Sequence, residues 1–163
     1  MALKRTHRLL IIILLGVLVS PDHIGCSSAP QKVALLKEKV YLGSLPIENT
    51  QAYQTFLNSS GSETAKLIYL GDRIKSAQNL SYYFEGTRYN WFEAYSGATW
   101  LLWQDHQHGE DAHSFIHREA IRFQNPTKPT TIEFPDRSRH LASEVLLNEL
   151  DLLEDIIKQN SST

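Results

Sequence analysis

A run of apolar residues follows a basic N-terminus in this chain, and it limits how much of the sequence belongs to the folded protein. The eleven residues from Leu9 to Val19 carry no polar side chain, and Lys and Arg side chains precede them. A basic start followed by about 7–15 apolar residues is typical of a secretory signal, because positive charge resists translocation while the apolar segment enters the translocon. The run is shorter than the roughly 20 residues of a membrane-spanning helix. We therefore expect residues 1–25 to be an export signal.

The single cysteine of the chain, Cys26, lies shortly after this run. One cysteine excludes an internal disulfide and a zinc site built from cysteines. The residues around it, Ile-Gly-Cys-Ser-Ser, resemble a bacterial lipoprotein signal, in which cleavage precedes a cysteine that becomes acylated. The resemblance implies a membrane anchor on Cys26 and a place in the cell envelope, facing the periplasm or the cell surface. A free cysteine in a linker after ordinary cleavage, or an uncleaved short anchor, are the alternatives.

Composition places the rest of the chain among ordinary folded domains. The chain has 163 residues, of which 42% are hydrophobic, and a formal net charge of −2. This length suits one domain, and the hydrophobic content is too high for a wholly disordered protein. Without a basic excess, binding to nucleic acid through its phosphates has no support. We expect no nucleic-acid partner.

Hydrophobic periodicity divides the mature chain into three parts. Residues 26–61 read as a tether and N-terminal extension, with a helical pattern over 47–57, and residues 159–163 as a frayed tail. Residues 62–158 alternate helical patterns with short strand patterns, which predicts a small single α+β domain of three to four helices with a minor sheet of short strands. Ser62 and Asn90 are at N-cap positions, and Glu93 completes a capping box with Asn90.

The expected elements follow in a definite order. Helices are expected from 62 to 77, after Asn90, from 110 to 123 and from 140 to 158, and short strands at 82–89, around Gly86, and at 130–134. The apolar stripe of the helix at 110–123 contains Ala112, Phe115 and Ile116. Arg137, Arg139 and His140 read as a solvated basic turn.

This motif order resembles the YfeK-like exported bacterial domains of unknown function. The residues that carry the resemblance are Gly86, Tyr89, Ala94, Trp100-Leu101, Trp103, Ala112 to Ile116, Ala120, Pro129, Phe134 to Asp136 and Val145 to Leu150. The resemblance implies a fold class and an envelope location, and no activity. The Ser-rich loop that the family tends to have is replaced here by residues 122–128.

Four histidines within residues 105–119 are a candidate metal site. His113 and His117 are four residues apart, so they share one helical face, and His106 or His108 is close enough to supply a further ligand. Imidazole with carboxylate suits a divalent metal such as zinc. The alternative is a solvated helix face, since His113 and His117 lie away from the apolar stripe.

An aromatic cluster between residues 82 and 103 is a second candidate site. Tyr89, Trp100 and Trp103 could form a platform for a ligand such as a sugar, but core packing is the favoured interpretation, because aromatic side chains dominate small cores. The sequence contains no nucleophile elbow, phosphate loop or dinucleotide fingerprint. We therefore expect an exported, lipid-anchored envelope protein with a non-enzymatic binding or structural role, an envelope partner or ligand, and no cofactor. The alternative is an exported metal-binding or metal-dependent protein.

Overall fold

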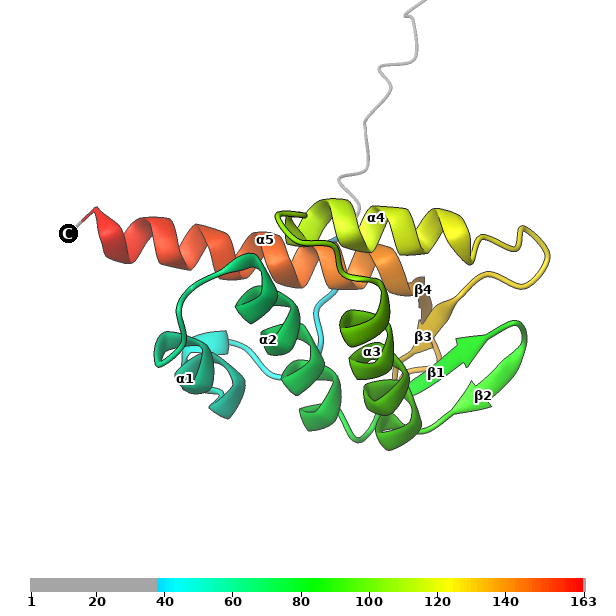
Figure 1. Cartoon of the computed structure of the whole chain (residues 1–163). Coiled ribbons are helices and arrows are strands. Elements are labelled where there is room, and N and C mark those ends of the chain that lie inside the picture. Colours follow the sequence, from blue (N-terminus) through cyan, green and yellow to red (C-terminus); the bar gives the residue numbers. More distant parts are fainter. Residues whose placement is uncertain (1–37, 163) are drawn as a thin grey trace, which may run out of the picture. The chain divides into compact units, whose positions relative to one another are not determined.

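The computed structural model describes residues 38–162, which form five α-helices and a four-stranded antiparallel sheet (Figure 1). This architecture confirms the predicted α+β class. Signal residues 1–25 and Cys26 lie outside the described residues. The elements in chain order are the 3₁₀ turn η1 (Ile47–Asn49), α1 (Gln51–Leu57), α2 (Glu63–Ser76), β1 (Ser81–Phe84), β2 (Thr87–Tyr89), α3 (Trp91–Asp105), α4 (Ala112–Arg122), β3 (Thr131–Glu133), β4 (Arg139–Leu141) and α5 (Ala142–Ser161).

Side-chain caps fix where four of the helices begin, and the Thr50 side chain provides the cap of α1. The Ser62 side chain accepts a hydrogen bond from the Ala65 backbone at the start of α2, and the Asp111 side chain accepts one from Ser114 at the start of α4. Asn90 and Glu93 form the predicted capping box at the start of α3. These contacts satisfy backbone N–H groups that have no partner within the helix.

The sheet has the order β2-β1-β3-β4, with every neighbouring pair antiparallel. Tyr82 on β1 pairs with Ile132 on β3, and both side chains are buried against the helices. The opposite face is polar: the Arg139 guanidinium lies 4.0 Å from the Tyr83 ring centroid and donates a 2.7 Å hydrogen bond from Nε to Glu133. The sheet therefore has one core face and one solvent face.

Strand β4 is a correction to the sequence analysis. Arg139 and His140 read as a solvated turn, but they pair with β3 opposite Glu133 and Ile132, respectively. The chain turns back through Pro135–Ser138, where the Asp136 side chain accepts hydrogen bonds from the backbone and hydroxyl of Ser138. The strand continues directly into α5.

The folded unit begins earlier in the chain than residue 62. Leu42, Ile47, Tyr53 and Phe56 are all buried within the described domain, so the second half of the expected extension is part of the core. At the other end, α5 continues to Ser161 instead of ending at residue 158. None of the helices formed by residues 38–162 has the length and apolarity that crossing a bilayer requires.

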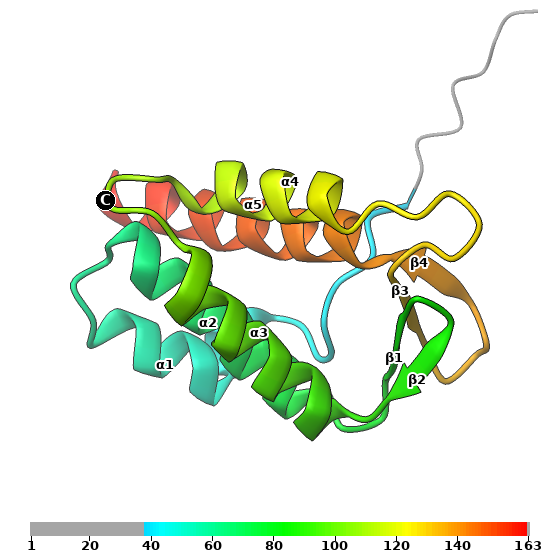
Figure 2. The ribbon, with the colours of Figure 1, turned by 45° about the vertical axis from the view of Figure 1, so that its right-hand side comes forward.

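Helix α5 runs the length of the domain and joins its two hydrophobic clusters. Leu150 and Leu153 are fully buried against α1, α2 and α4, whereas Val145 packs beside the sheet residues Tyr82 and Ile132. Figures 1 and 2 show the sheet at one end of the helices, with α3 beside α2 and α4 along α5. This arrangement leaves α3 and α4 as the two walls of a hollow.

Candidate functional site

A groove of about 750 Å³ lies between α3 and α4 and is the candidate site. We call it the α3–α4 groove. Its floor includes Leu70, Ile74, Tyr82, Ile132 and Leu146, and its lining is largely apolar and aromatic. The volume is within the range of small-molecule sites, roughly 300–1,000 Å³, and such sites are mostly apolar.

Small residues on α3 create the hollow. Ala94, Gly97 and Ala98 line the groove at a helical spacing of three to four residues, and a Cβ atom added at Gly97 would meet nothing within 4 Å. Opposite them, Ala120 and Ile121 of α4 also line the groove. The side chains on this side of α3 are therefore too short to reach across to α4.

The two ends of α3 are fixed, which holds the groove open between them. At the C-terminal end, Arg118 Nη2 donates a 2.8 Å hydrogen bond to the Asp105 carbonyl, and Arg122 Nη1 lies 2.7 Å from Asp105 Oδ2. Glu119 lines the groove and is 7% exposed, and both arginines hydrogen-bond to its carboxylate. At the N-terminal end, the capping box at Asn90 follows β2 directly.

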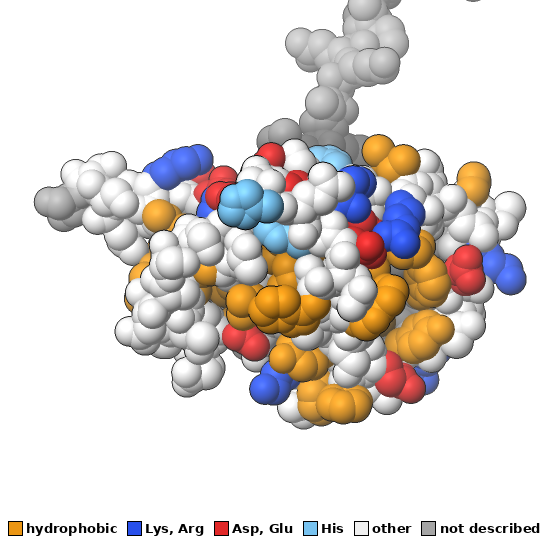
Figure 3. All heavy atoms as spheres, in the orientation of Figure 1, with side chains coloured by type: hydrophobic (Ala, Val, Ile, Leu, Met, Phe, Trp, Pro, Cys, Tyr) orange, Lys and Arg blue, Asp and Glu red, His pale blue; other side chains and the backbone are white. Residues whose placement is uncertain are grey.

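The edges of the groove expose large apolar side chains to solvent. Trp100 is 58% exposed on the α3 edge and Ile121 is 72% exposed on the α4 edge, and both line the groove. Figure 3 shows hydrophobic side chains gathered on the face of the molecule where α3 lies. An exposed apolar surface of this kind marks a binding site more often than a surface of scattered residues does.

Polar groups in the groove are few, and no lysine or arginine is among its lining residues. The Tyr82 hydroxyl is buried and has no hydrogen-bond partner among residues 38–162. Burial raises the pKa of Tyr82, so the phenol stays protonated at neutral pH. Glu93 and His117 are exposed at the groove edge. The lining therefore favours an uncharged molecule over an anionic one.

The structure brings together two of the three residues of the predicted aromatic platform. Tyr89 and Trp100 both line the α3–α4 groove, whereas Trp103 lies outside it and is 70% exposed. Sequence reasoning missed the α4 wall and the floor of the site. In the sequence, both appear only as stripes of apolar residues, and such a stripe looks the same whether it lines a groove or packs in a closed core.

The four histidines of the predicted metal site take separate roles. His113 Nε2 lies 3.0 Å from Asp151 Oδ1 of α5, and His106 Nε2 lies 3.0 Å from the Glu110 carbonyl. His108 is exposed in the loop, and His117 faces the groove edge. Within residues 38–162, no three His, Cys, Asp or Glu side chains gather as a metal site would require. The metal site stays a prediction.

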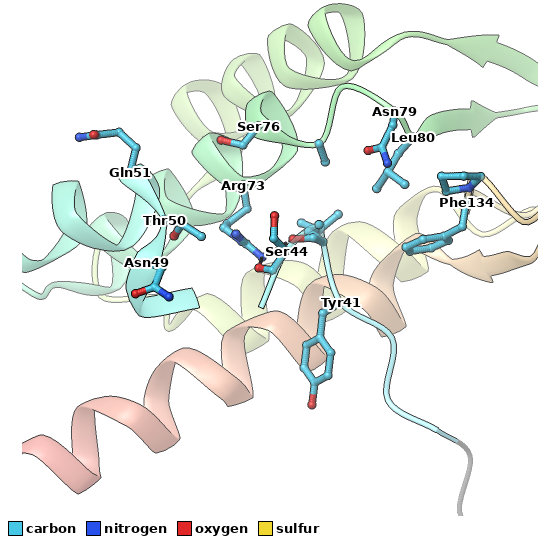
Figure 4. Close-up of a pocket in the computed structure, with 14 residues that line it drawn as sticks. Tyr41, Ser44, Asn49, Thr50, Gln51, Arg73, Ser76, Asn79, Leu80 and Phe134 are labelled. Atoms are coloured by element: carbon cyan, nitrogen blue, oxygen red, sulfur yellow. Dashed lines mark hydrogen bonds between the residues drawn. The ribbon is translucent and has the colours of Figure 1, made fainter. Parts of the chain in front are cut away.

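A second hollow of about 490 Å³ lies beside the N-terminal loop and is lined by polar side chains (Figure 4). Arg73 reaches into its wall, but it is 2% exposed, and its Nε and Nη2 atoms donate to Glu149, Leu42 and Ser44. Asn49 and Asn79 are exposed to solvent. The Arg73 charge is therefore used in contacts that stabilise the fold and is not available to a ligand in this hollow.

Acid is expected to weaken the contact between α2 and α4. Glu63 Oε2 accepts a 2.9 Å hydrogen bond from the Ala112 backbone, and Oε1 lies 2.7 Å from Lys66 Nζ. Burial acts to raise the pKa of Glu63, but the hydrogen bonds from Lys66 and Ala112 outweigh it and lower that pKa. Such a carboxylate stabilises the fold above its unfolded pKa of about 4.3, and this stabilisation is lost as the pH falls through its folded pKa.

Urea unfolding at about pH 6 and pH 3 tests this contact. The free energy of unfolding is expected to be lower at the acidic pH, and the decrease is expected to be smaller for Glu63→Gln, which keeps an acceptor for Ala112 and loses the titrating charge. An equal decrease in the variant would show that Glu63 is not one of the groups responsible.

Comparison with known proteins finds no match to a protein-family model, to a curated protein or to a solved structure. The resemblance to YfeK-like exported domains therefore stays a prediction. The candidate site rests on the geometry of the chain itself.

Proposed function

We propose that this protein is an exported, membrane-tethered binding protein that holds an uncharged, lipid-like molecule in the α3–α4 groove. The observation that carries the proposal is the groove itself: about 750 Å³, apolar on its floor and both walls, and open to solvent between exposed Trp100 and Ile121. In a closed core these side chains would be buried, and each buried methylene group would stabilise the fold by about 0.8 kcal/mol. A ligand with an alkyl chain gains the same stabilisation.

The charge of the lining supports an uncharged ligand. Two carboxylates, Glu93 and Glu119, line the groove, and no cation lines it. A fatty acid would bring its own carboxylate into this site without a partner, which is unfavourable in an apolar environment. A neutral head group, such as that of a monoacylglycerol, meets no such penalty.

Displacement of Nile red, an uncharged fluorophore, from the full-length chain tests the proposal. We expect Nile red emission to rise on binding, and monolauroylglycerol to displace it at lower concentration than laurate, which has the same acyl chain. Ile121→Ser is expected to weaken binding because it removes the apolar α4 edge. Leu57→Ser, at an apolar position on α1 that is 54% exposed, is the matched control and is expected to leave binding unchanged. Displacement by neither lipid would refute the proposal.

The export and anchoring part of the proposal rests on the apolar run and on Cys26. Expression of the full-length gene in a bacterial host, followed by intact-mass measurement of membrane and soluble fractions, tests it separately. The expected product begins at Cys26, carries acyl groups and is found in the membrane fraction. A soluble, unacylated product would remove the anchor and leave the groove to be tested as that of a free protein.

A further inference from the structure

Helix α3 exposes three aromatic rings, of which two, those of Phe92 and Trp103, lie outside the groove lining. Phe92 is 60% exposed, Trp100 58% and Trp103 70%. The spacing of eight and eleven residues from Phe92 places the three rings on one side of the helix, over about three turns. Only Leu102 of α3 is fully buried. We call these three rings the aromatic face.

The two charged side chains of helix α3 are both acidic. Helix α3 contains two ionisable acids, Glu93 and Asp105, and no lysine or arginine. The Glu93 carboxylate accepts a 2.8 Å hydrogen bond from the Asn90 backbone, and the Asp105 carboxylate pairs with Arg122 at 2.7 Å. Helix α3 therefore offers no cation of its own that would attract anionic lipid. A bilayer whose head groups are neutral overall therefore suits this face better than an anionic bilayer does.

We propose that the aromatic face of α3 inserts into the interface of a neutral, zwitterionic lipid bilayer. Tryptophan and phenylalanine suit this position, because an indole ring has an apolar body and an N–H group that stays in contact with water or head groups. A helix that lies in the interface buries its apolar side and keeps its other side in the protein or in solvent. This contact is separate from any lipid anchor on Cys26.

The aromatic face is continuous with the α3–α4 groove through Trp100, which belongs to both. A bilayer that covers Phe92 and Trp103 therefore lies against the α3 edge of the groove. A lipid-like molecule could pass between the bilayer and the groove along Trp100 without crossing open water. This step rests on the proposed function, whereas insertion of the face does not.

Fluorescence of a single tryptophan tests the insertion. In the full-length chain with Trp91→Phe and Trp100→Phe, Trp103 is the only indole, since the sequence has three tryptophans. Vesicles of phosphatidylcholine with brominated acyl chains are expected to quench Trp103 and to shift its emission to shorter wavelength. Phe92→Ser is expected to weaken this response about tenfold, because burial of a phenylalanine ring is worth roughly that factor or more. Leu57→Ser is the control that leaves the response unchanged.

Two outcomes would overturn the proposal. In the first, the chain binds vesicles through its N-terminal segment while the emission of Trp103 does not change. In the second, Trp103 shifts with protein concentration in the absence of lipid, which would mean that a second copy of the chain covers the face. Phe92 lies outside the groove lining, so Phe92→Ser should keep Nile red binding. Failure of insertion is therefore distinguishable from failure of the groove.

Discussion

Replacing Glu149 with glutamine is expected to lower the free energy of unfolding by about 3–5 kcal/mol, the range found when one partner of a buried ion pair is removed. Glu149 is 0% exposed and Arg73 is 2% exposed, and Arg73 Nε lies 2.5 Å from Glu149 Oε1. In the variant, the Arg73 charge stays buried without a counter-charge. Burying an unpaired charge costs more free energy than burying an unpaired neutral polar group.

The loss extends beyond the ion pair. Glu149 Oε1 also accepts a 2.8 Å hydrogen bond from the Tyr69 hydroxyl, and Oε2 accepts one of 2.9 Å from the Leu42 backbone. Burial and the neighbouring Glu149 charge raise the pKa of Tyr69, so its hydroxyl remains a donor. A glutamine amide has only one acceptor oxygen, so it places an NH₂ group against one of these donors.

Urea unfolding measures the effect, and two variants make it specific. Asp155→Asn on the exposed side of α5 is the matched control and is expected to change stability by less than about 0.5 kcal/mol. The double variant Arg73→Met with Glu149→Gln removes both charges and is expected to be less destabilised than the sum of the two single variants. Additive single effects would contradict a direct Arg73–Glu149 interaction.

This cluster also explains why the folded unit begins before residue 62. The Leu42 backbone donates to Glu149, and the Leu42 and Ser44 carbonyls accept from Arg73. The Leu42–Glu149 contact joins residues 107 positions apart, and the two contacts to Arg73 join residues 31 and 29 positions apart. A tether-like composition around residues 26–46 could not reveal them, because the partners lie on distant helices.

The sequence does contain a signal for the buried pair. Arg73 is three residues after Leu70 and adjacent to Ile74, and Glu149 lies four residues from both Val145 and Leu153. Both charges therefore fall within apolar stripes, where a charged residue is rarely fully buried unless it is paired. Because one charge is positive and the other negative, the two stripes together predict an ion pair between the helices that contain Arg73 and Glu149.

Local signals account for the elements that were predicted, and non-local pairing accounts for the one that was missed. Caps at Ser62 and Asn90 and the helical stripes depend on neighbours within a few residues, so the sequence shows them directly. Strand β4 has only three residues, one of them a basic residue, and it exists because β3 lies beside it. A strand this short has no periodicity to detect.

The groove was harder to predict than the helices that form it. Helix α3 is apolar on nearly every side, which is the pattern of a helix surrounded by core, and this favoured core packing for the aromatic cluster. In the structure, Phe92, Trp100 and Trp103 are all more than half exposed. Burial of α3 depends on whether another element covers it, and within the described residues α4 stands away from it along the groove.

Replacing Gly97 with leucine is expected to weaken ligand binding by about 10–100-fold without destabilising the fold. A Cβ atom at Gly97 meets nothing within 4 Å, and the residue lines the groove, so the new side chain would occupy space that the proposed ligand needs. Displacing two or three methylene groups of an alkyl chain, at about 0.8 kcal/mol each, gives an affinity loss of this size.

The same substitution should strengthen the helix. Gly97 is in the middle of α3, where glycine is about 1 kcal/mol less favourable than a good helix former such as leucine. Most substitutions that abolish binding also reduce stability, and this one is expected to reduce binding while the free energy of unfolding stays equal or rises. Nile red titration and urea unfolding of the same preparations measure both quantities.

Ser96→Leu is the matched control because it adds the same side chain one position away, on the exposed side of α3 and outside the groove lining. It is expected to keep wild-type affinity for monolauroylglycerol. If Gly97→Leu folds with unchanged stability and binds as tightly as the wild type, the α3–α4 groove is not the ligand site. If both variants lose binding, the ligand contacts the outer side of α3, where the aromatic face lies.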